Sequence, residues 1–328
     1  MLAVAAAWLT IATSVLGVDG GALPEQARWR PLVKTPGVVD VVGPRADGRL
    51  VLATHSGLRL LRPGSAPQPF APGYAPPPGE PYIALAPDRR LPRAKCSFKR
   101  DDLYALEPTA TPGIVRIDRR GRAARFADLP AGSFPSGIAF DRVGRFGGRL
   151  LVTALLAGKI HLYGFDCRGR SHAFVSDGPP VEGGIAVAPR SFGRFAGHLI
   201  AASEATGRIF AFDPGGRVRL VAESGLPAGG DIGVESVGFV PSGLGPGGAA
   251  YLADMGAPGS PTQGTDSLLV LRGPDLARAR LRPGELVAAT EGGAKSIAIR
   301  CARRCTVRRF AIGPTATHGE GHVTFVRD

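Results

Sequence analysis

The stretch SGIAF (136–140), followed by RFGGRLLV (145–152), decides the fold of this chain. A second copy follows it as GGIAV (183–187) and RFAGHLIA (194–201), so that Ile138 and its counterpart lie 47 residues apart. Each copy continues with a Gly-Lys-Ile or Gly-Arg-Ile step and a Phe-Asp-x-x-Gly-Arg turn. A period in this range with four short apolar runs per unit is typical of one β-propeller blade.

Weaker copies extend the repeat in both directions. They lie at 41–52, 82–118, 237–271 and 296–326. The last unit is one strand short, and the run Trp29–Val33 can supply that strand. The sequence therefore predicts an all-β, six-bladed β-propeller whose ring is closed by an N-terminal strand that completes the last blade. A β-sandwich is the main alternative, but it does not explain the repeat.

The composition agrees with many short strands broken by turns. The 328 residues include 47 Gly and 30 Pro, spread along the chain, and 44% are hydrophobic. Residues 1–16 are apolar and carry no charged side chain, and 16 residues are fewer than the roughly 20 that a membrane span needs. We therefore expect a signal peptide at 1–22 and a propeller at 23–328, with secretion or another extracytoplasmic location and no stable membrane span after cleavage. An uncleaved anchor and a misassigned start are the alternatives.

The net charge of +13 suggests a polyanion as partner, but the pattern of basic residues does not. They are scattered along the chain and only 7% of residues are aromatic, whereas nucleic-acid binders combine clustered basic residues with aromatics. We expect no specific nucleic-acid binding. Many Arg residues fall on one predicted face, which is either a solvated surface or a docking face for an acidic partner. They include Arg89, Arg90, Arg93, Arg119, Arg120, Arg145, Arg168, Arg303 and Arg304.

Four cysteines are consistent with an oxidising compartment. Cys301 and Cys305 bracket three residues between two strand-like runs, which predicts a disulfide across a tight turn; metal binding by this pair lacks a second ligand pair nearby. Cys96 and Cys167 fall on the same face of neighbouring predicted blades, so we expect them to form the second disulfide.

The repeated motifs resemble those of NHL-type and SMP-30 (gluconolactonase-like) six-bladed propellers over nearly the whole chain after the signal segment. The resemblance implies a fold, and many unrelated functions share that fold. It also implies a divalent metal held at the central channel by Glu, Asn and Asp, with Glu80 in Gly79–Tyr82 at the place of the entry Glu. This sequence contains no Asn, so a metal site here has to be built from carboxylates or from carboxylates and His.

In a propeller blade, the loop that enters the innermost strand and the turn between the second and third strands lie on the same face. In this sequence at least eight carboxylates fall at such positions, which predicts an acidic channel mouth. Crowded carboxylates raise each other's pKa values unless a cation or a basic partner neutralises them. The alternative is that acids at turns only cap backbone N–H groups. The predicted ligand-binding residues are His55, Glu80, Glu107 and Glu204, and the predicted metal ligands are Glu182, Glu235 and Asp254.

Two histidines near the C-terminus, His318 and His322, have a spacing that suits metal ligation on a helix. Glycines on both sides of them favour a loop, which predicts a loop ligand or a surface histidine. His55 also fits the catalytic position of quinoprotein dehydrogenases, although its neighbours do not match that motif. No Gly-x-Ser-x-Gly nucleophile motif is present.

These observations predict an exported propeller that binds a small ligand, a divalent metal (calcium, manganese or zinc) or a protein partner at its acidic channel face. Catalysis does not follow from them. A metal-dependent lactone or ester hydrolase of the gluconolactonase type is the alternative, and a scaffold that uses blade surfaces is a third reading.

Overall fold

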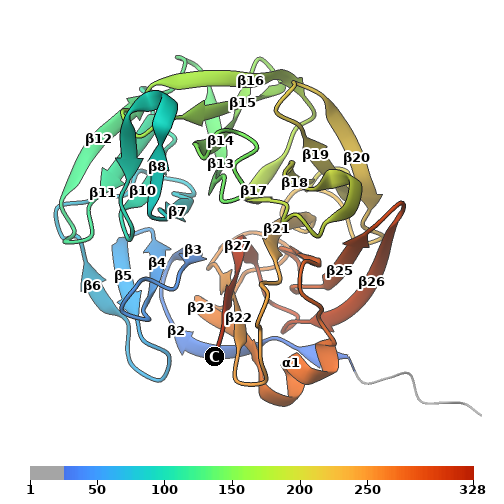
Figure 1. Ribbon diagram of the computed structural model, residues 1–328. Helices are drawn as coiled ribbons and strands as arrows, with labels where there is room; N and C mark the ends of the chain where they lie inside the picture. The colour runs from blue at the N-terminus through green and yellow to red at the C-terminus, as the bar shows by residue number, and fades with distance from the viewer. Residues whose placement is uncertain (1–25) are drawn as a thin grey trace, which may run out of the picture.

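The computed structural model describes residues 26–328, so the predicted signal peptide at 1–22 lies outside the described residues. Figure 1 shows β-sheets arranged around a central axis, with the N-terminal and C-terminal segments on the same side of the ring. The chain is all-β apart from short helical turns, as the sequence predicts. Within residues 26–328, no helix is both long and apolar enough to cross a membrane.

Four sheets of four antiparallel strands form most of the ring. Their strands are β3 to β6 (Val38–Val42, Leu50–Thr54, Gly57–Leu61, Gln68–Phe70); β7, β10, β11 and β12 (Ile83–Leu85, Leu103–Glu107, Gly113–Ile117, Ala123–Asp128); β13 to β16 (Phe134–Phe140, Leu150–Leu156, Lys159–Phe165, Ser171–Gly178); and β17 to β20 (Glu182–Val187, Leu199–Ser203, Arg208–Phe212, Val218–Glu223). The two clear sequence repeats correspond to the third and fourth of these sheets.

A nine-stranded sheet occupies the rest of the ring, in the order β1-β26-β25-β24-β21-β27-β22-β23-β2. Its strands are β1 (Ala27–Arg28), β2 (Arg30–Lys34), β21 (Val234–Phe239), β22 (Ala249–Asp254), β23 (Ser267–Arg272), β24 (Leu286–Thr290), β25 (Ser296–Cys301), β26 (Cys305–Ile312) and β27 (Gly319–Val326). It consists of two rows of antiparallel strands, β26-β25-β24-β21 and β27-β22-β23-β2. The two rows join through a parallel pairing of β21 with β27, at Val237 and His322. Strand β1 adds to the outer edge in parallel with β26.

The prediction that 237–271 and 296–326 form two separate units is wrong in the way it groups their strands. Strand β21 pairs with β24 and not with β22, while β27 pairs with β22. Strand β27 can lie against β21 because Gly238 has no side chain: a Cβ atom there would lie 1.9 Å from the carbonyl oxygen of Val323. Close backbone approach of this kind is a standard use of glycine. The hairpin β22–β23 therefore lies between β21 and β24 in the sequence but pairs with β27 and β2, while β21 pairs directly with β24.

The N-terminal strand joins the sheet that contains the C-terminal strand. Strand β2 pairs in antiparallel fashion with β23, and Trp29 is buried, with its indole Nε1 donating a 2.9 Å hydrogen bond to Ser296 Oγ. Pairing with β2 covers the edge of β23, and β2 becomes the outermost strand at this end of the sheet.

Each sheet buries both of its faces. Leu150, Val152 and Ala154 of β14 pack into one apolar cluster with Tyr104, whereas Leu151 packs into another cluster with Leu199. Alternate residues of a strand point to opposite faces. The continuous apolar runs of the repeat are therefore explained by neighbouring sheets packed on each side.

The Phe-Asp-x-x-Gly-Arg motif forms the turn between the third and fourth strands of a repeat. Asp166 accepts hydrogen bonds from the backbone N–H groups of Arg168 and Arg170 and from the Arg170 guanidinium. Asp213 makes the same contacts with Gly215 and Arg217. Gly169 and Gly216 have positive φ, which favours glycine. The motif thus specifies a turn in which one carboxylate satisfies three donors.

Short elements fill the loops. They are β8 (Arg89–Leu91), β9 (Cys96–Phe98), the helical turns η1 (Pro92–Ala94) and η2 (Gly193–Phe195), and helix α1 (Gly273–Ala279). Both predicted disulfides are present: Cys96 bonds to Cys167, and Cys301 bonds to Cys305. The first joins the β8–β9 hairpin to the turn after β15, so it ties two neighbouring sheets together.

Candidate functional site

Three glutamates gather around one tyrosine at the inner strands. Glu80 lies in the loop before β7, Glu235 is in β21 and Glu320 is in β27, and one oxygen from each lies within 4.8 Å of the others. Glu235 and Glu320 are buried, whereas Glu80 is partly exposed. We call Glu80, Glu235 and Glu320 the first acidic group.

The hydroxyl of Tyr82 holds this group together. It lies 2.5 Å from an oxygen of Glu80, 2.5 Å from one of Glu235 and 2.9 Å from one of Glu320. A phenol has a single proton to donate, so it cannot donate to all three carboxylates. Burial, followed by the charge of Glu80, raises the pKa of Glu235 well above its ordinary value. Burial and the charge of Glu235 do the same for the pKa of Glu320.

A second group shares one member with the first. Glu291, directly after β24, and His318, directly before β27, bring ligand atoms within 4.8 Å of one another and of Glu320. The Nε2 atom of His318 lies 3.4 Å from Glu291 Oε1 and 3.3 Å from Glu320 Oε1. Burial, then the charge of Glu235, raises the pKa of Glu291 to about 12. We call Glu291, His318 and Glu320 the second acidic group.

Several carboxylate oxygens in this region have no hydrogen-bond partner. Among the described residues, buried oxygens Oε1 of Glu204, Oε2 of Glu291 and Oε1 of Glu320 are left without one. A buried polar atom without a partner costs about 1–3 kcal/mol, and more when the group is charged. The arrangement is therefore suited to an additional positively charged group, and a divalent cation with oxygen ligands meets that need.

The predicted metal ligands are distributed differently from the sequence-based hypothesis. Glu235 lies in the first acidic group. Glu182 stands near it: burial, then the charges of Glu80 and Glu204, raises the pKa of Glu182 to about 7. Asp254 is engaged elsewhere, because its carboxylate accepts hydrogen bonds from Thr265 N, Thr265 Oγ1 and His318 N. The structure brings Glu235 together with Glu80 and Glu320, and it uses Asp254 to hold the backbone of His318.

Of the predicted ligand-binding residues, Glu80 and Glu204 lie at this site. Glu107 is instead ion-paired with Arg125 at the end of β10. His55 is exposed and would contact any side chain placed at Gly37. Neither Glu107 nor His55 belongs to either acidic group.

The two C-terminal histidines are not surface residues. His318 is buried at the entrance of β27, and His322 lies within that strand. Both nitrogens of His322 face acceptors: Nδ1 lies 3.0 Å from Asp40 Oδ2, and Nε2 lies 3.0 Å from the carbonyl oxygen of Ile138. The expectation of a loop was wrong for His322, because Gly319 and Gly321 are accommodated inside a strand whose neighbours approach closely.

Sequence reasoning missed Tyr82 and Glu291, and it left His318 open between a loop ligand and a surface histidine. Glu291 follows the apolar run Leu286–Thr290 and precedes Gly292 and Gly293, which is the same strand-then-acid-then-glycine pattern that marks other predicted turns. A strand predicted at 286–290 would have made Glu291 a candidate ligand at the turn that follows it. Tyr82 begins the predicted unit 82–118, and nothing in that strand pattern distinguishes it from an aromatic residue of the core.

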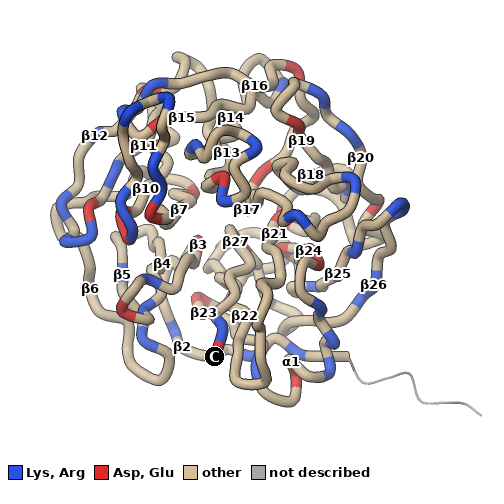
Figure 2. Tube along the Cα trace, viewed as in Figure 1, with Lys and Arg blue, Asp and Glu red and all other residues tan. Residues whose placement is uncertain are grey.

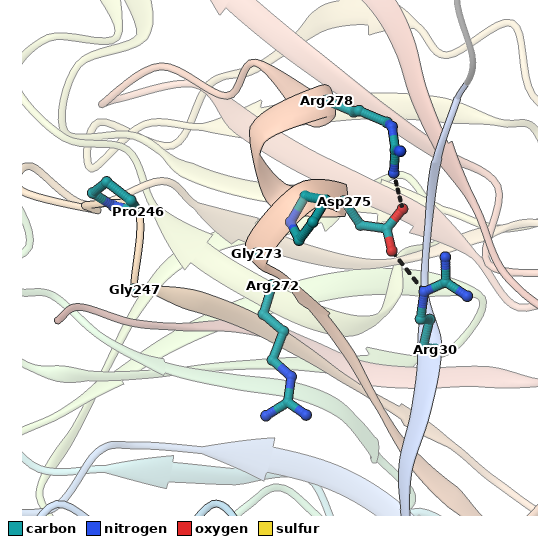
Figure 3. Close-up of a pocket in the computed structure, with 8 residues that line it drawn as sticks. Arg30, Pro246, Gly247, Arg272, Gly273, Asp275 and Arg278 are labelled. Atoms are coloured by element: carbon teal, nitrogen blue, oxygen red, sulfur yellow. Dashed lines mark hydrogen bonds and ion pairs between the residues drawn. The ribbon is translucent and has the colours of Figure 1, made fainter.

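An open pocket of about 610 Å³ beside α1 is separate from this site. Figure 3 shows the Asp275 carboxylate between Arg278 and Arg30. Asp275 also accepts a 3.1 Å hydrogen bond from Arg28 N. These contacts fix the N-terminal strands against α1. The pocket lies at this junction, and its residues Arg30 and Asp275 are already used to hold the strands in place.

The acidic groups are exceptional in a chain of net charge +13. Figure 2 shows Lys and Arg spread around the whole ring, with Asp and Glu both on outer turns and near the inner strands. Many outer acids are neutralised by arginine, for example in the pairs Arg170–Asp166 and Arg217–Asp213. The two acidic groups have no Lys or Arg partner among the ion pairs of residues 26–328.

No family model and no curated protein matches the sequence. Solved structures with similar folds do match. The calcium-binding protein regucalcin from Agrobacterium tumefaciens strain C58 is 10% identical, with a TM-score of 0.51 over 91% of this chain and 82% of that one. Virginiamycin B lyase from Staphylococcus aureus is 12% identical, with a TM-score of 0.48 over 89% and 90% of the two chains. A gluconolactonase from Xanthomonas campestris is 17% identical, with a TM-score of 0.41 over 70% of each.

At such identities the similarity concerns the fold alone, and it agrees with the resemblance that the sequence motifs indicate. The chain has a β-propeller fold.

Proposed function

We propose that this chain is an exported propeller that binds a divalent cation at the first acidic group, in the centre of a six-bladed ring. The two antiparallel rows of the nine-stranded sheet then count as two interleaved blades, the last of them completed by β2. The two disulfides support an oxidising, extracytoplasmic location.

The observation that carries the proposal is the packing of three glutamates around Tyr82, two of them buried and neither neutralised by Lys or Arg. Carboxylate oxygens are the ligands that calcium, magnesium and manganese prefer. A cation would replace the protons that Glu235 and Glu320 must otherwise hold. A small molecule or a protein partner with a basic group is the other class of ligand that this charge distribution fits.

The test is thermal unfolding of residues 23–328 in chelator and then in calcium, manganese or zinc. An ion present at 100 times its dissociation constant should stabilise the fold by about 2.7 kcal/mol. The substitutions E235Q and E320Q should abolish this shift, whereas E107Q removes an acid outside the groups and should keep it. If none of the three ions shifts the unfolding midpoint, the metal-site proposal fails.

A second candidate function is metal-dependent hydrolysis of a lactone or ester. The observation that favours it is Glu182, whose pKa is raised to about 7 by burial beside Glu80 and Glu204. A general base is most effective when its pKa is near the working pH. A bound cation would supply polarisation of the substrate carbonyl, and Glu182 would accept the proton of the attacking water.

This candidate is tested with a panel of lactones and esters in the presence of the ion that stabilises the fold. We expect E182Q to lose turnover while it keeps the metal-induced thermal shift. Turnover that survives E182Q unchanged contradicts the assigned base, and a panel without turnover leaves cation binding as the function.

A further inference from the structure

Glu320 belongs to both acidic groups, and its two oxygens face different partners. Oε2 lies 2.9 Å from the hydroxyl of Tyr82, in the first group. Oε1 lies 3.3 Å from Nε2 of His318, in the second group. The side chain is fully buried, and Oε1 has no hydrogen-bond partner within residues 26–328. A carboxylate placed in this way can offer one oxygen to each of two ions.

We propose that Glu320 bridges two divalent cations, one held by the first acidic group and one by the second. The first ion is the one of the proposed function, on which this inference rests. The second ion is bound by Glu291, His318 and the Oε1 atom of Glu320.

The histidine is oriented as a metal ligand. Its Nδ1 atom lies 3.0 Å from the carbonyl oxygen of Thr262, and a carbonyl only accepts, so Nδ1 carries the proton. In the neutral ring the lone pair is then on Nε2, which faces Glu291 and Glu320. Metal-ligating histidines commonly fix their other ring nitrogen on a carbonyl in this way.

The second group also has unused ligand capacity. Glu291 is 5% exposed, and its Oε2 atom is buried with no hydrogen-bond partner in the described part of the chain. His318 is 3% exposed. Buried polar atoms normally find partners, so the unpartnered oxygens of Glu291 and Glu320 are free to act as ligands of a cation.

Backbone hydrogen bonds fix the position of this group. Glu291 N donates to Gly233 O at 2.9 Å, and Gly319 N donates to Glu291 O at 3.0 Å. His318 N donates to Asp254 Oδ1 at 2.9 Å. The ligands therefore come from two chain segments, Glu291 after β24 and His318 with Glu320 at the start of β27, which these hydrogen bonds hold in place; this is the preorganisation that a metal site requires.

The charge balance favours two ions over one. The two groups together contain four glutamates, Glu80, Glu235, Glu291 and Glu320, and one histidine. Two divalent cations balance the charge of four ionised carboxylates, whereas with one cation two of the carboxyl groups have to keep their protons to avoid unpaired buried charge.

The donor sets suit a common probe ion. The first group offers only oxygen, and the second offers oxygen and one imidazole nitrogen, so Mn²⁺ is acceptable to both. The experiment is equilibrium dialysis of residues 23–328 against Mn²⁺. Elemental analysis measures the number of metal ions per chain, and electron paramagnetic resonance measures whether the bound ions are exchange-coupled.

We expect two Mn²⁺ per chain with the spectrum of an exchange-coupled pair. The substitutions E291Q and H318Q should each lower the count to one and restore an uncoupled six-line spectrum, while E107Q should keep both ions and the coupling. The wild-type measurement decides the proposal even where a variant fails to fold.

One Mn²⁺ per chain overturns the second site but leaves the proposed cation binding intact. No bound Mn²⁺, together with no thermal shift from any ion, overturns both. Two ions without exchange coupling overturn the bridging role of Glu320.

Discussion

The imidazole of His322 lies 3.0 Å from the carboxylate of Asp40, across 282 residues of sequence. His322 also faces the carbonyl oxygen of Ile138 with its other nitrogen, so both ring nitrogens act as donors. Burial lowers the pKa of His322, but the charge of Asp40 and the hydrogen bonds raise it more, and the net pKa is above the ordinary value. This buried ion pair joins the first and last inner strands of the ring.

Replacing Asp40 should be strongly destabilising. Asp40 also accepts hydrogen bonds from Val41 N and Ile83 N, so D40N leaves a buried cation and weakens two further contacts. We expect the free energy of unfolding to fall by about 3–5 kcal/mol, measured by urea denaturation. The double variant D40N/H322Q should lose less than the sum of the two single losses. Simple additivity would show that the two side chains do not interact.

The two disulfides should contribute unequally to stability. Cys96 and Cys167 are separated by 71 residues, whereas Cys301 and Cys305 are separated by 4. In the chain-entropy model the longer loop stabilises by about 4 kcal/mol and the shorter by about 2. We therefore expect C96S/C167S to unfold at a lower urea concentration than C301S/C305S. Equal losses would contradict an entropic origin.

The aspartates of the repeated turn should stabilise the fold in a pH-dependent way. Burial raises the pKa of Asp166, but hydrogen bonds from Arg168 N and Arg170 lower it more, and the net pKa is below the ordinary value. A lowered pKa contributes stability above the unfolded value of about 3.9, and this is lost as the pH falls through the folded value. At pH about 7, D166A should lose about 1–3 kcal/mol of unfolding free energy.

The difference between wild type and D166A should shrink as the pH is lowered from about 4 to about 2. D177A is the matched control, because Asp177 is an exposed acid with a surface partner, Lys159. Its removal should change the unfolding free energy by less than about 1 kcal/mol. A pH-independent loss in D166A would show that the turn loses packing and not charged hydrogen bonds.

Ionisation of Glu182 should change the free energy of unfolding in the opposite direction with pH, so that stability falls as the pH rises. Its pKa is raised to about 7, so the folded protein holds a proton that the unfolded chain releases at about 4.3. In chelator, this group should lower the free energy of unfolding by at most about 3 kcal/mol as the pH rises from about 4.5 to about 7. We expect E182Q to remove that part of the slope in urea denaturation at several pH values. An identical slope in both proteins would contradict a raised pKa of Glu182.

The local features of the fold could be predicted from the sequence because they depend on nearby residues. The 47-residue repeat, the aspartate turns and the apolar runs result from strand alternation and turn chemistry, which operate over a few residues. The order of the repeats also predicts the Cys96–Cys167 disulfide, because consecutive repeats form neighbouring sheets. Glu80, Glu204 and Glu235 could be assigned to one face of the ring for the same reason, because each is at a turn or an entry of a repeat.

The sequence by itself determined that this chain is a repeated β-sheet ring with acids at one set of turns. Only the tertiary structure decided that β27 lies between β21 and β22, since Gly238 permits a backbone contact that sequence order does not suggest. That placement brings Glu320 to Glu235 and His318 to Glu291. Period and turn chemistry act between residues close in sequence, whereas these ligand sets depend on which distant strands pack together.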